Sequence, residues 1–190
     1  ESDNPFRRGS SAPTANAGYG KLKEPLLQAT ALLRAFDASA RNGRFAIPRA
    51  DAALGQTALH SPTVFNFFEP DYVLPGPLAA AGLRAPEYQI LTATSAITIP
   101  NFLRSLIFTP NPPPDDALTL SLDPLVALAR SPREMVNDCN LVFCGGGMTQ
   151  AARDRIESAV ADLPRRMPPL ARARYALELT VTSPEAAIQR

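Results

Sequence analysis

The sequence has little of what metal and redox chemistry usually needs. It contains one histidine, His60, and two cysteines, Cys139 and Cys144. A site built from several histidines is therefore excluded within these residues. Two cysteines at this spacing are not a zinc-binding signature either. We expect His60 to be a loop histidine beside the aromatic stretch that follows it, and we predict no metal and no cofactor.

Long apolar runs are also missing. No stretch of about 18 apolar residues occurs, so no membrane-spanning helix is predicted. The formal net charge is +1, and this balance gives no electrostatic attraction to nucleic acid or to an anionic membrane. The glycines at 145–147 are not followed by Lys-Ser/Thr and no strand pattern precedes them, which excludes a phosphate-binding loop.

Strand patterns are nearly absent, whereas proline is abundant, with 20 residues. Apolar stripes at helical spacing often begin at a proline or a capping residue, which predicts an all-α fold. We expect an irregular helical domain with long proline-rich loops. Residues 1–19 are predicted to be a flexible lead-in and residues 20–190 a single helical domain. A chain that opens in this way is expected to be part of a larger helical precursor.

Caps, prolines and glycines set the expected limits of the helices. Pro100 is expected to kink the longest one or to divide it, because proline lacks an N–H and disfavours the α conformation at the residue before it. Residues 109–120 are predicted to be a stiff, partly polyproline connection. The predicted helical segments are Glu24 or Pro25 to Phe36, Asp51–Gln56, Ala85–Phe108, Pro124–Arg130, 132–144, Gln150–Leu163, and Pro168 or Pro169 to Thr182. Residues Leu78–Ala81 are expected to form a brief turn that Gly82 ends. The apolar face expected along the longest segment consists of Ile90, Ala93, Ile97, Leu103, Leu106 and Ile107.

The stretch Ser61–Tyr72 is rich in both aromatic residues and proline. Phe65, Phe67 and Phe68 are three of the nine phenylalanines and lie close together in the sequence. Each ring can bury about 150–250 Å². Prolines near both ends limit regular structure between them. We therefore predict an irregular segment whose rings pack into the core against the helix that begins near Pro86.

Acidic residues at the exit of this stretch are candidates for a ligand-binding rim. Glu69 and Asp71, with Tyr72, are expected to approach Glu87 if the aromatic stretch packs on the following helix. Carboxylates grouped in this way bind hard cations such as calcium or act as acid and base on a glycan. The alternative is a set of caps and salt bridges, since an acid in a first helical turn complements the helix dipole. No residue is assigned as catalytic.

Three states are open for the two cysteines: a disulfide, two buried thiols, or a metal or thioether role. If Cys139 and Cys144 lie in one regular helix, their Cα atoms are about 8.5 Å apart. A disulfide needs less than about 7 Å. A bridge therefore requires the helix to unwind near Gly145, although an exported location would favour oxidation.

A basic region lies near the C-terminus, with acidic residues interleaved. A solvated helix face is the expected state, and a surface for an acidic partner is the alternative. No aromatic residues alternate with these arginines, so nucleic-acid binding is not predicted. The arginines are Arg153, Arg155, Arg165, Arg166, Arg172 and Arg174.

The order of several motifs resembles a bacterial family catalogued as domain of unknown function 1800 (DUF1800). The resemblance covers about residues 20–190. Its central and terminal motifs are specific when they are taken in combination. The matching stretches are Gly20–Pro25, Leu54–Gln56, Ser61–Phe68, Pro70–Tyr72, Ala85–Ile90, Cys144–Thr149 and Thr182–Arg190. It implies a mostly helical, exported bacterial protein that is longer than this chain and is often encoded beside another exported protein of sulfatase-like type. It supplies no catalytic residues.

From this resemblance, and from the lack of a catalytic constellation, we expect a non-enzymatic structural or binding component of an exported bacterial assembly. The expected location is periplasmic or secreted. The expected partner is the N-terminal half of the same precursor or another subunit. The alternative is a hydrolase that acts on an extracellular polymer and whose catalytic residues lie in an N-terminal half outside this sequence.

Overall fold

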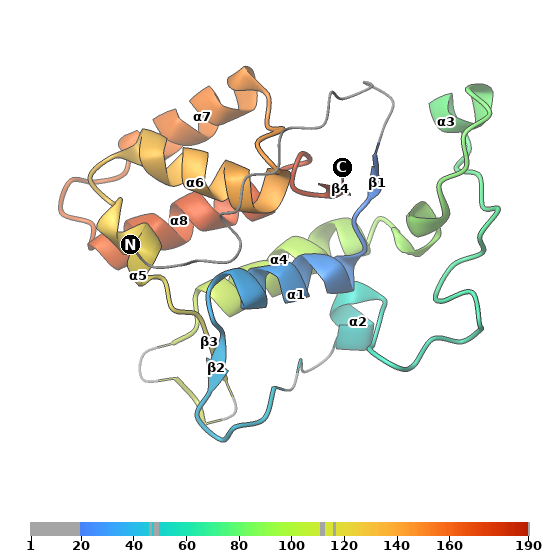
Figure 1. Cartoon of the computed structure of the whole chain (residues 1–190), viewed down its shortest axis with the longest axis horizontal. Helices are drawn as coiled ribbons and strands as arrows, with labels where there is room; N and C mark the ends of the chain where they lie inside the picture. Colours follow the sequence, from blue (N-terminus) through green and yellow to red (C-terminus); the bar gives the residue numbers. More distant parts are fainter. Residues whose placement is uncertain (1–19, 46, 48–49, 111–112, 116, 190) are drawn as a thin grey trace.

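The computed structural model describes residues 20–45, 47, 50–110, 113–115 and 117–189. The predicted lead-in, residues 1–19, lies outside these ranges. The described chain is predominantly helical, but it is not all-α as predicted, because two short antiparallel sheets also form (Figure 1). Each strand is two residues long, too short to leave an alternating pattern that sequence analysis can detect.

The helices and strands follow one another along the chain with long connections in the first half. The helices are α1 (Pro25–Ala35), α2 (Ala50–Leu54), α3 (Pro77–Ala80), the 3₁₀ helix η2 (Pro86–Ile90), α4 (Ser95–Ile107), α5 (Asp123–Ala127), α6 (Pro132–Cys144), α7 (Gln150–Ala161) and α8 (Pro169–Val181). The strands are β1 (Lys21–Leu22), β2 (Ser39–Ala40), β3 (Leu118–Thr119) and β4 (Ile188–Gln189). Strand β1 pairs with β4, and β2 pairs with β3.

Local capping explains the limits of α6 and α7, which agree closely with the prediction. The hydroxyl of Ser131 accepts a hydrogen bond from the Glu134 N–H at 3.4 Å, and Thr149 accepts one from the Ala152 N–H at 3.2 Å. Each bond satisfies an N–H that a helix start leaves without a partner. Gly145 ends α6 with a φ of 58°, in the left-handed conformation that glycine adopts at little cost.

The predicted segment Ala85–Phe108 divides at a different place from the one expected. The break falls between η2 and α4, and Pro100 lies inside α4. Thr92 and Ser95 form reciprocal hydrogen bonds, in which the backbone N–H of each donates to the side-chain oxygen of the other, at 2.6 and 3.2 Å. This pair starts a new helix five residues before the proline, so the break does not require Pro100.

The new start also changes which side chains of α4 face the core. Ile97, predicted as buried, is 65% exposed, and Ala93 is exposed as well. Ile99 and Leu103, four residues apart, are buried instead. Because residues two apart point to nearly opposite sides of a helix, burial of Ile99 turns Ile97 outward.

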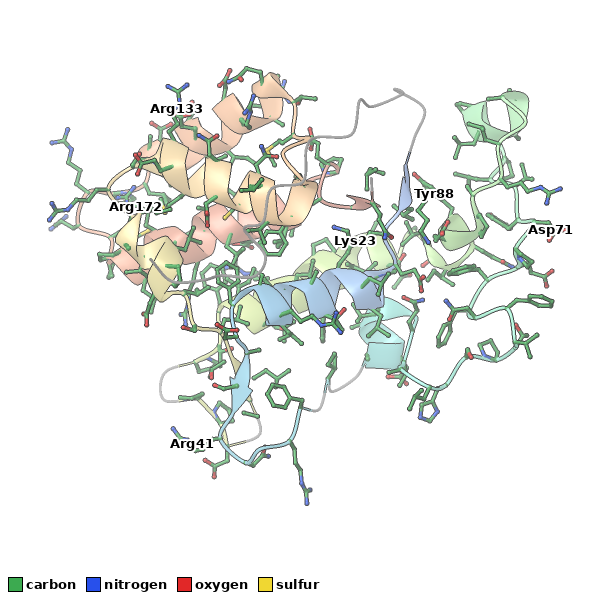
Figure 2. All side chains as sticks on the ribbon, in the orientation of Figure 1. Lys23, Arg41, Asp71, Tyr88, Arg133 and Arg172 are labelled. Carbon is green, nitrogen blue, oxygen red and sulfur yellow. The ribbon has the colours of Figure 1, made fainter. Side chains whose placement is uncertain are left out.

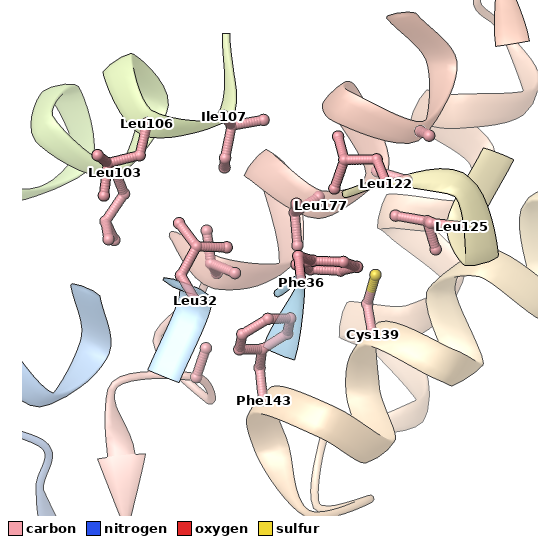
Figure 3. Packing of buried hydrophobic residues seen from close by; sticks show 14 of the residues in the cluster. Leu32, Phe36, Leu103, Leu106, Ile107, Leu122, Leu125, Cys139, Phe143 and Leu177 are labelled. Carbon is pink, nitrogen blue, oxygen red and sulfur yellow. The ribbon is translucent and has the colours of Figure 1, made fainter. Parts of the chain in front are cut away.

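The core lies where α8 packs among α4, α5, α6 and α7, with α1 closing one side (Figure 3). Leu32, Leu125 and Leu177 have no exposed surface. The rings of Phe36 and Phe143 lie 6.1 Å apart between their centroids, which joins the end of α1 to α6. These helices therefore share one apolar interior.

The prediction that the aromatic stretch is buried in this core is wrong. Phe65 is 60% exposed, Phe67 and Phe68 are half-buried, and none of the three belongs to the core cluster. The chain from α2 to η2 runs along one side of the molecule, away from α6, α7 and α8 (Figure 1). Polar contacts connect this part of the chain to the start of α1, such as the hydrogen bond that Asn66 Nδ2 donates to Glu24 Oε2 at 3.0 Å.

Cys139 and Cys144 are buried thiols that are not joined to each other, so the structure has the second of the three states considered and not a disulfide. The reason is geometric, because α6 stays helical through Cys144 and does not unwind before Gly145. Burial raises the pKa of the Cys139 thiol, which keeps it protonated and therefore weakly nucleophilic.

We expect neither cysteine to react with iodoacetamide in the native protein, because Cys139 is 1% exposed and Cys144 is 8% exposed. Mass spectrometry of native and urea-unfolded samples, alkylated without reductant, checks this. The unfolded sample is the control and should gain two carbamidomethyl groups. Full protection of both thiols after unfolding would instead indicate a disulfide and contradict the structure.

Candidate functional site

A single carboxylate, that of Glu24, joins three separate segments at the start of α1. Its Oε2 atom accepts a hydrogen bond from Gln56 Nε2 at 2.8 Å and another from Asn66 Nδ2 at 3.0 Å. Gln56 is 1% exposed, and its Oε1 accepts a hydrogen bond from the Leu26 N–H at 3.2 Å. Gln56 thus caps α1 from a distant part of the chain, a role usually played by the residue before the helix. We call Glu24, Gln56 and Asn66 the polar junction.

Two lysines, one in β1 and one between β1 and α1, connect this part of the chain to other elements. Lys21 Nζ lies 3.2 Å from Glu87 Oε1, and Glu87 is buried. Lys23 Nζ donates a hydrogen bond to the Phe143 carbonyl at 3.1 Å, near the C-terminal end of α6, where a cation is favourable. Burial lowers the pKa of Lys23. Motifs distant in sequence, at 20–25, 54–56, 61–68 and 85–90, therefore meet around one corner of the fold.

The residues predicted to form a carboxylate rim lie in different surroundings. Glu87 is committed to Lys21, whereas Glu69 and Asp71 are exposed, and Asp71 lies at the outer edge of the molecule (Figure 2). Tyr72 is half-buried, and its carbonyl accepts a hydrogen bond from the Ala85 N–H at 2.9 Å. Among the described residues, no group of three or more His, Cys, Asp or Glu is arranged to hold a metal ion. Glu87 fits the salt-bridge alternative.

The chain between α2 and η2, residues 57–84, forms an arm that presents apolar side chains to solvent. Its backbone is fixed by polar contacts, such as the hydrogen bond from the Glu69 N–H to Gln89 Oε1 at 2.6 Å and the bond from Asn66 to Glu24. Leu59 is fully exposed and has a φ of 63°, a conformation that leucine rarely adopts. The large exposed apolar residues of the arm are Leu59, Val64, Phe65, Val73 and Leu83.

An open hollow of about 470 Å³ lies between α2 and the arm. Helix α2, on one side of the hollow, is connected to α4 by the hydrogen bond that Thr98 Oγ1 donates to the Ala53 carbonyl at 2.8 Å. His60 belongs to this hollow, beside the aromatic stretch as expected. Its lining includes Asp51, Gly55, Gln56, Thr57, His60 and Phe67.

The arginines near the C-terminus do not act together as one site. The guanidinium of Arg172 donates hydrogen bonds to the carbonyls of Val160 at 2.7 Å and Pro164 at 3.1 Å, at the end of α7. Arg153 donates to Gln150, within the first turn of α7. These side chains stabilise helix ends, whereas Arg165 and Arg166 are exposed in the loop before α8.

Sequence analysis missed the polar junction because its three side chains are 10 to 42 positions apart along the chain, and each residue type is ordinary for a surface loop. The sequence offered only an indirect indication of the junction, because all three residues lie in stretches that carry the family resemblance. Within the described chain, no helix has the length and apolar character needed to cross a membrane.

Comparison with protein families matches residues 6–188 to a family described as "Protein of unknown function (DUF1800)". This match spans nearly the whole sequence and agrees with the motifs identified above. No curated protein and no solved structure matches the chain.

Proposed function

The chain belongs to the DUF1800 family, and on that premise we propose that it is a non-enzymatic structural or binding component of an exported, periplasmic or secreted bacterial assembly. The observation that carries this proposal is the arm, residues 57–84. It is held in a defined shape by hydrogen bonds, yet it leaves five large apolar side chains exposed. Exposed apolar surface of this kind is typical of a protein–protein contact.

The conformation of Leu59 supports the same interpretation. A leucine in the left-handed region carries strain of about 1–2 kcal/mol, and here its side chain gains nothing from burial, because it is fully exposed. Strained residues of this kind are concentrated at functional sites. Contact with a partner would bury the side chain, and full burial of a leucine is worth about 1.5–3 kcal/mol.

The charges on the arm indicate the chemistry of the partner. Glu69 and Asp71 are exposed on the same segment as Phe65 and Val64. An apolar centre with an acidic edge fits a protein surface that offers an apolar groove with basic residues beside it. We propose that this surface belongs to another subunit of the assembly, and a contact with the N-terminal half of the same precursor is the other outcome that the experiment distinguishes.

The double substitution Leu59→Ser and Phe65→Ser is expected to weaken partner binding by about 2 kcal/mol or more, roughly thirtyfold in Kd, because two apolar anchors are lost. A photocrosslinking residue at position 64, in the protein expressed from its own locus, first identifies the contacted polypeptide and its site. Affinity for that polypeptide is then measured with and without the double substitution.

Leu141→Ser is the matched control, since Leu141 is 55% exposed but lies on α6, outside the arm. This variant should bind the crosslinked polypeptide with an affinity within about twofold of that of the unmodified protein. Crosslinks found only within the protein's own polypeptide would assign the contact to the N-terminal half of the same precursor. Equal affinities for the arm variant and the Leu141 variant would refute the proposal.

A further inference from the structure

We propose that the hollow between α2 and the arm binds a neutral saccharide ring. Its volume of about 470 Å³ lies within the range of small-molecule sites, about 300–1,000 Å³. One wall is the half-buried ring of Phe67 and the other is the exposed side of α2, which carries Asp51. This site is separate from the exposed apolar residues of the arm and does not depend on the docking proposal.

The lining combines an aromatic side chain with polar groups that the described residues leave without hydrogen bonds. The side chains of Asp51, Thr57 and His60 make no hydrogen bond to any residue in the described ranges. A carboxylate accepts hydrogen bonds, a hydroxyl both donates and accepts, and an imidazole offers two ring nitrogens. The ring of Phe67 presents an electron-rich face. A pyranose matches this set, since its hydroxyls donate and accept while its C–H groups pack on an aromatic face.

Both walls of the hollow are held at a fixed separation by the polar junction. Gln56 ends the α2 side, Asn66 immediately precedes Phe67, and the same Glu24 oxygen accepts a hydrogen bond from each of them. Gly55, with a φ of 67°, makes the tight turn between α2 and Gln56. A ligand therefore meets a preformed site, which reduces the ordering cost of binding.

The charge of the lining favours a neutral ligand over an anionic one. Asp51 places a carboxylate in the wall, and a phosphate or uronate bound there would face like-charge repulsion. A cation held between Asp51 and the Phe67 ring is the competing possibility. A cation, however, leaves the Thr57 hydroxyl and the second nitrogen of His60 unused, whereas the hydroxyls of a sugar engage both groups.

Saturation-transfer NMR and calorimetry on the purified protein test this inference, with maltotriose, cellotriose, mannotriose and chitotriose as probes and tetramethylammonium as the cationic probe. At least one trisaccharide should bind, with its ring C–H protons receiving saturation. Phe67→Ala should raise Kd roughly tenfold, and Asp51→Asn should raise it by a similar factor. Phe67→Tyr, which keeps the platform, should bind within about threefold of the unmodified protein.

Phe65→Ala is the matched control, because it removes the same side chain from the same stretch but lies outside the hollow. It should leave saccharide affinity unchanged. Asp51 is exposed, so Asp51→Asn tests the site even if Phe67→Ala fails to fold. The inference is overturned if no trisaccharide binds, if Phe65→Ala and Phe67→Ala act alike, or if only tetramethylammonium binds. None of these outcomes affects the docking test, which uses Leu59, Val64 and Phe65.

Discussion

Leu177→Ala is expected to lower the free energy of unfolding by about 2–5 kcal/mol. Leu177 is on α8, has no exposed surface and lies in the centre of the core close to Phe36 and Leu122 (Figure 3). The helices around α8 come from four different segments, so they cannot all move inward to fill the space that the shorter side chain leaves. Domains of this size are stabilised by about 5–15 kcal/mol, so the loss is a large share of the total.

Urea unfolding followed by far-UV circular dichroism measures this loss as a shift of the midpoint. Leu179→Ala is the matched control, since Leu179 lies on the same helix but is 37% exposed. It removes the same atoms and has the same effect on helix propensity. A shift of equal size for the two variants would show that helix propensity, and not core burial, determines the result.

Glu24→Ala is expected to have the second largest effect, a loss of about 1.5–3 kcal/mol in the free energy of unfolding, because hydrogen bonds to a charged group are lost. The substitution removes the acceptor shared by Gln56 and Asn66 and takes from Gln56, which is 1% exposed, the acceptor of its Nε2 group. Because Asn66 connects the arm to α1 through this carboxylate, the arm should also lose its fixed position. Hydrogen exchange of the backbone amides at 63–72 measures that second effect.

Glu69→Ala provides the comparison, because Glu69 is an exposed acidic residue of the arm whose side chain lies outside the polar junction. Its effect should stay within about 0.5 kcal/mol, with no faster exchange in the arm. Glu24→Gln keeps an oxygen acceptor, so its loss of unfolding free energy should lie between those of Glu24→Ala and Glu69→Ala. If Glu24→Ala destabilises the protein but leaves exchange in the arm unchanged, the junction supports α1 only and does not hold the arm.

The second half of the fold was predictable because its signals are local. Ser131, Thr149 and Gly145 each act within a few residues of their own position, so the caps and ends of α6 and α7 could be placed from the sequence. The start of α4 was missed although its signal is also local. Thr92 and Ser95 form a capping pair, but Pro100 was the more conspicuous feature and was assumed to mark the break.

The first half of the fold depends on contacts that cross long stretches of sequence, and it was predicted poorly. Three phenylalanines suggested a buried segment, whereas the structure fixes that segment through Asn66 and leaves Phe65 exposed. Hydrophobicity shows that a side chain gains from burial, but it does not identify the surface that buries it. The salt bridge of Glu87 could not be predicted for the same reason, because its partner, Lys21, is far away in the sequence.

The pairing of β1 with β4 determines how the domain would respond to mechanical tension. Lys21 lies opposite Gln189, and Leu22 lies opposite Ile188, so the chain enters and leaves the described domain at one place (Figure 1). A pull on the polypeptide on both sides of the domain would therefore load this two-residue ribbon first, separating its hydrogen bonds one after another. The helices of the core would lie outside the line of force until the ribbon opened.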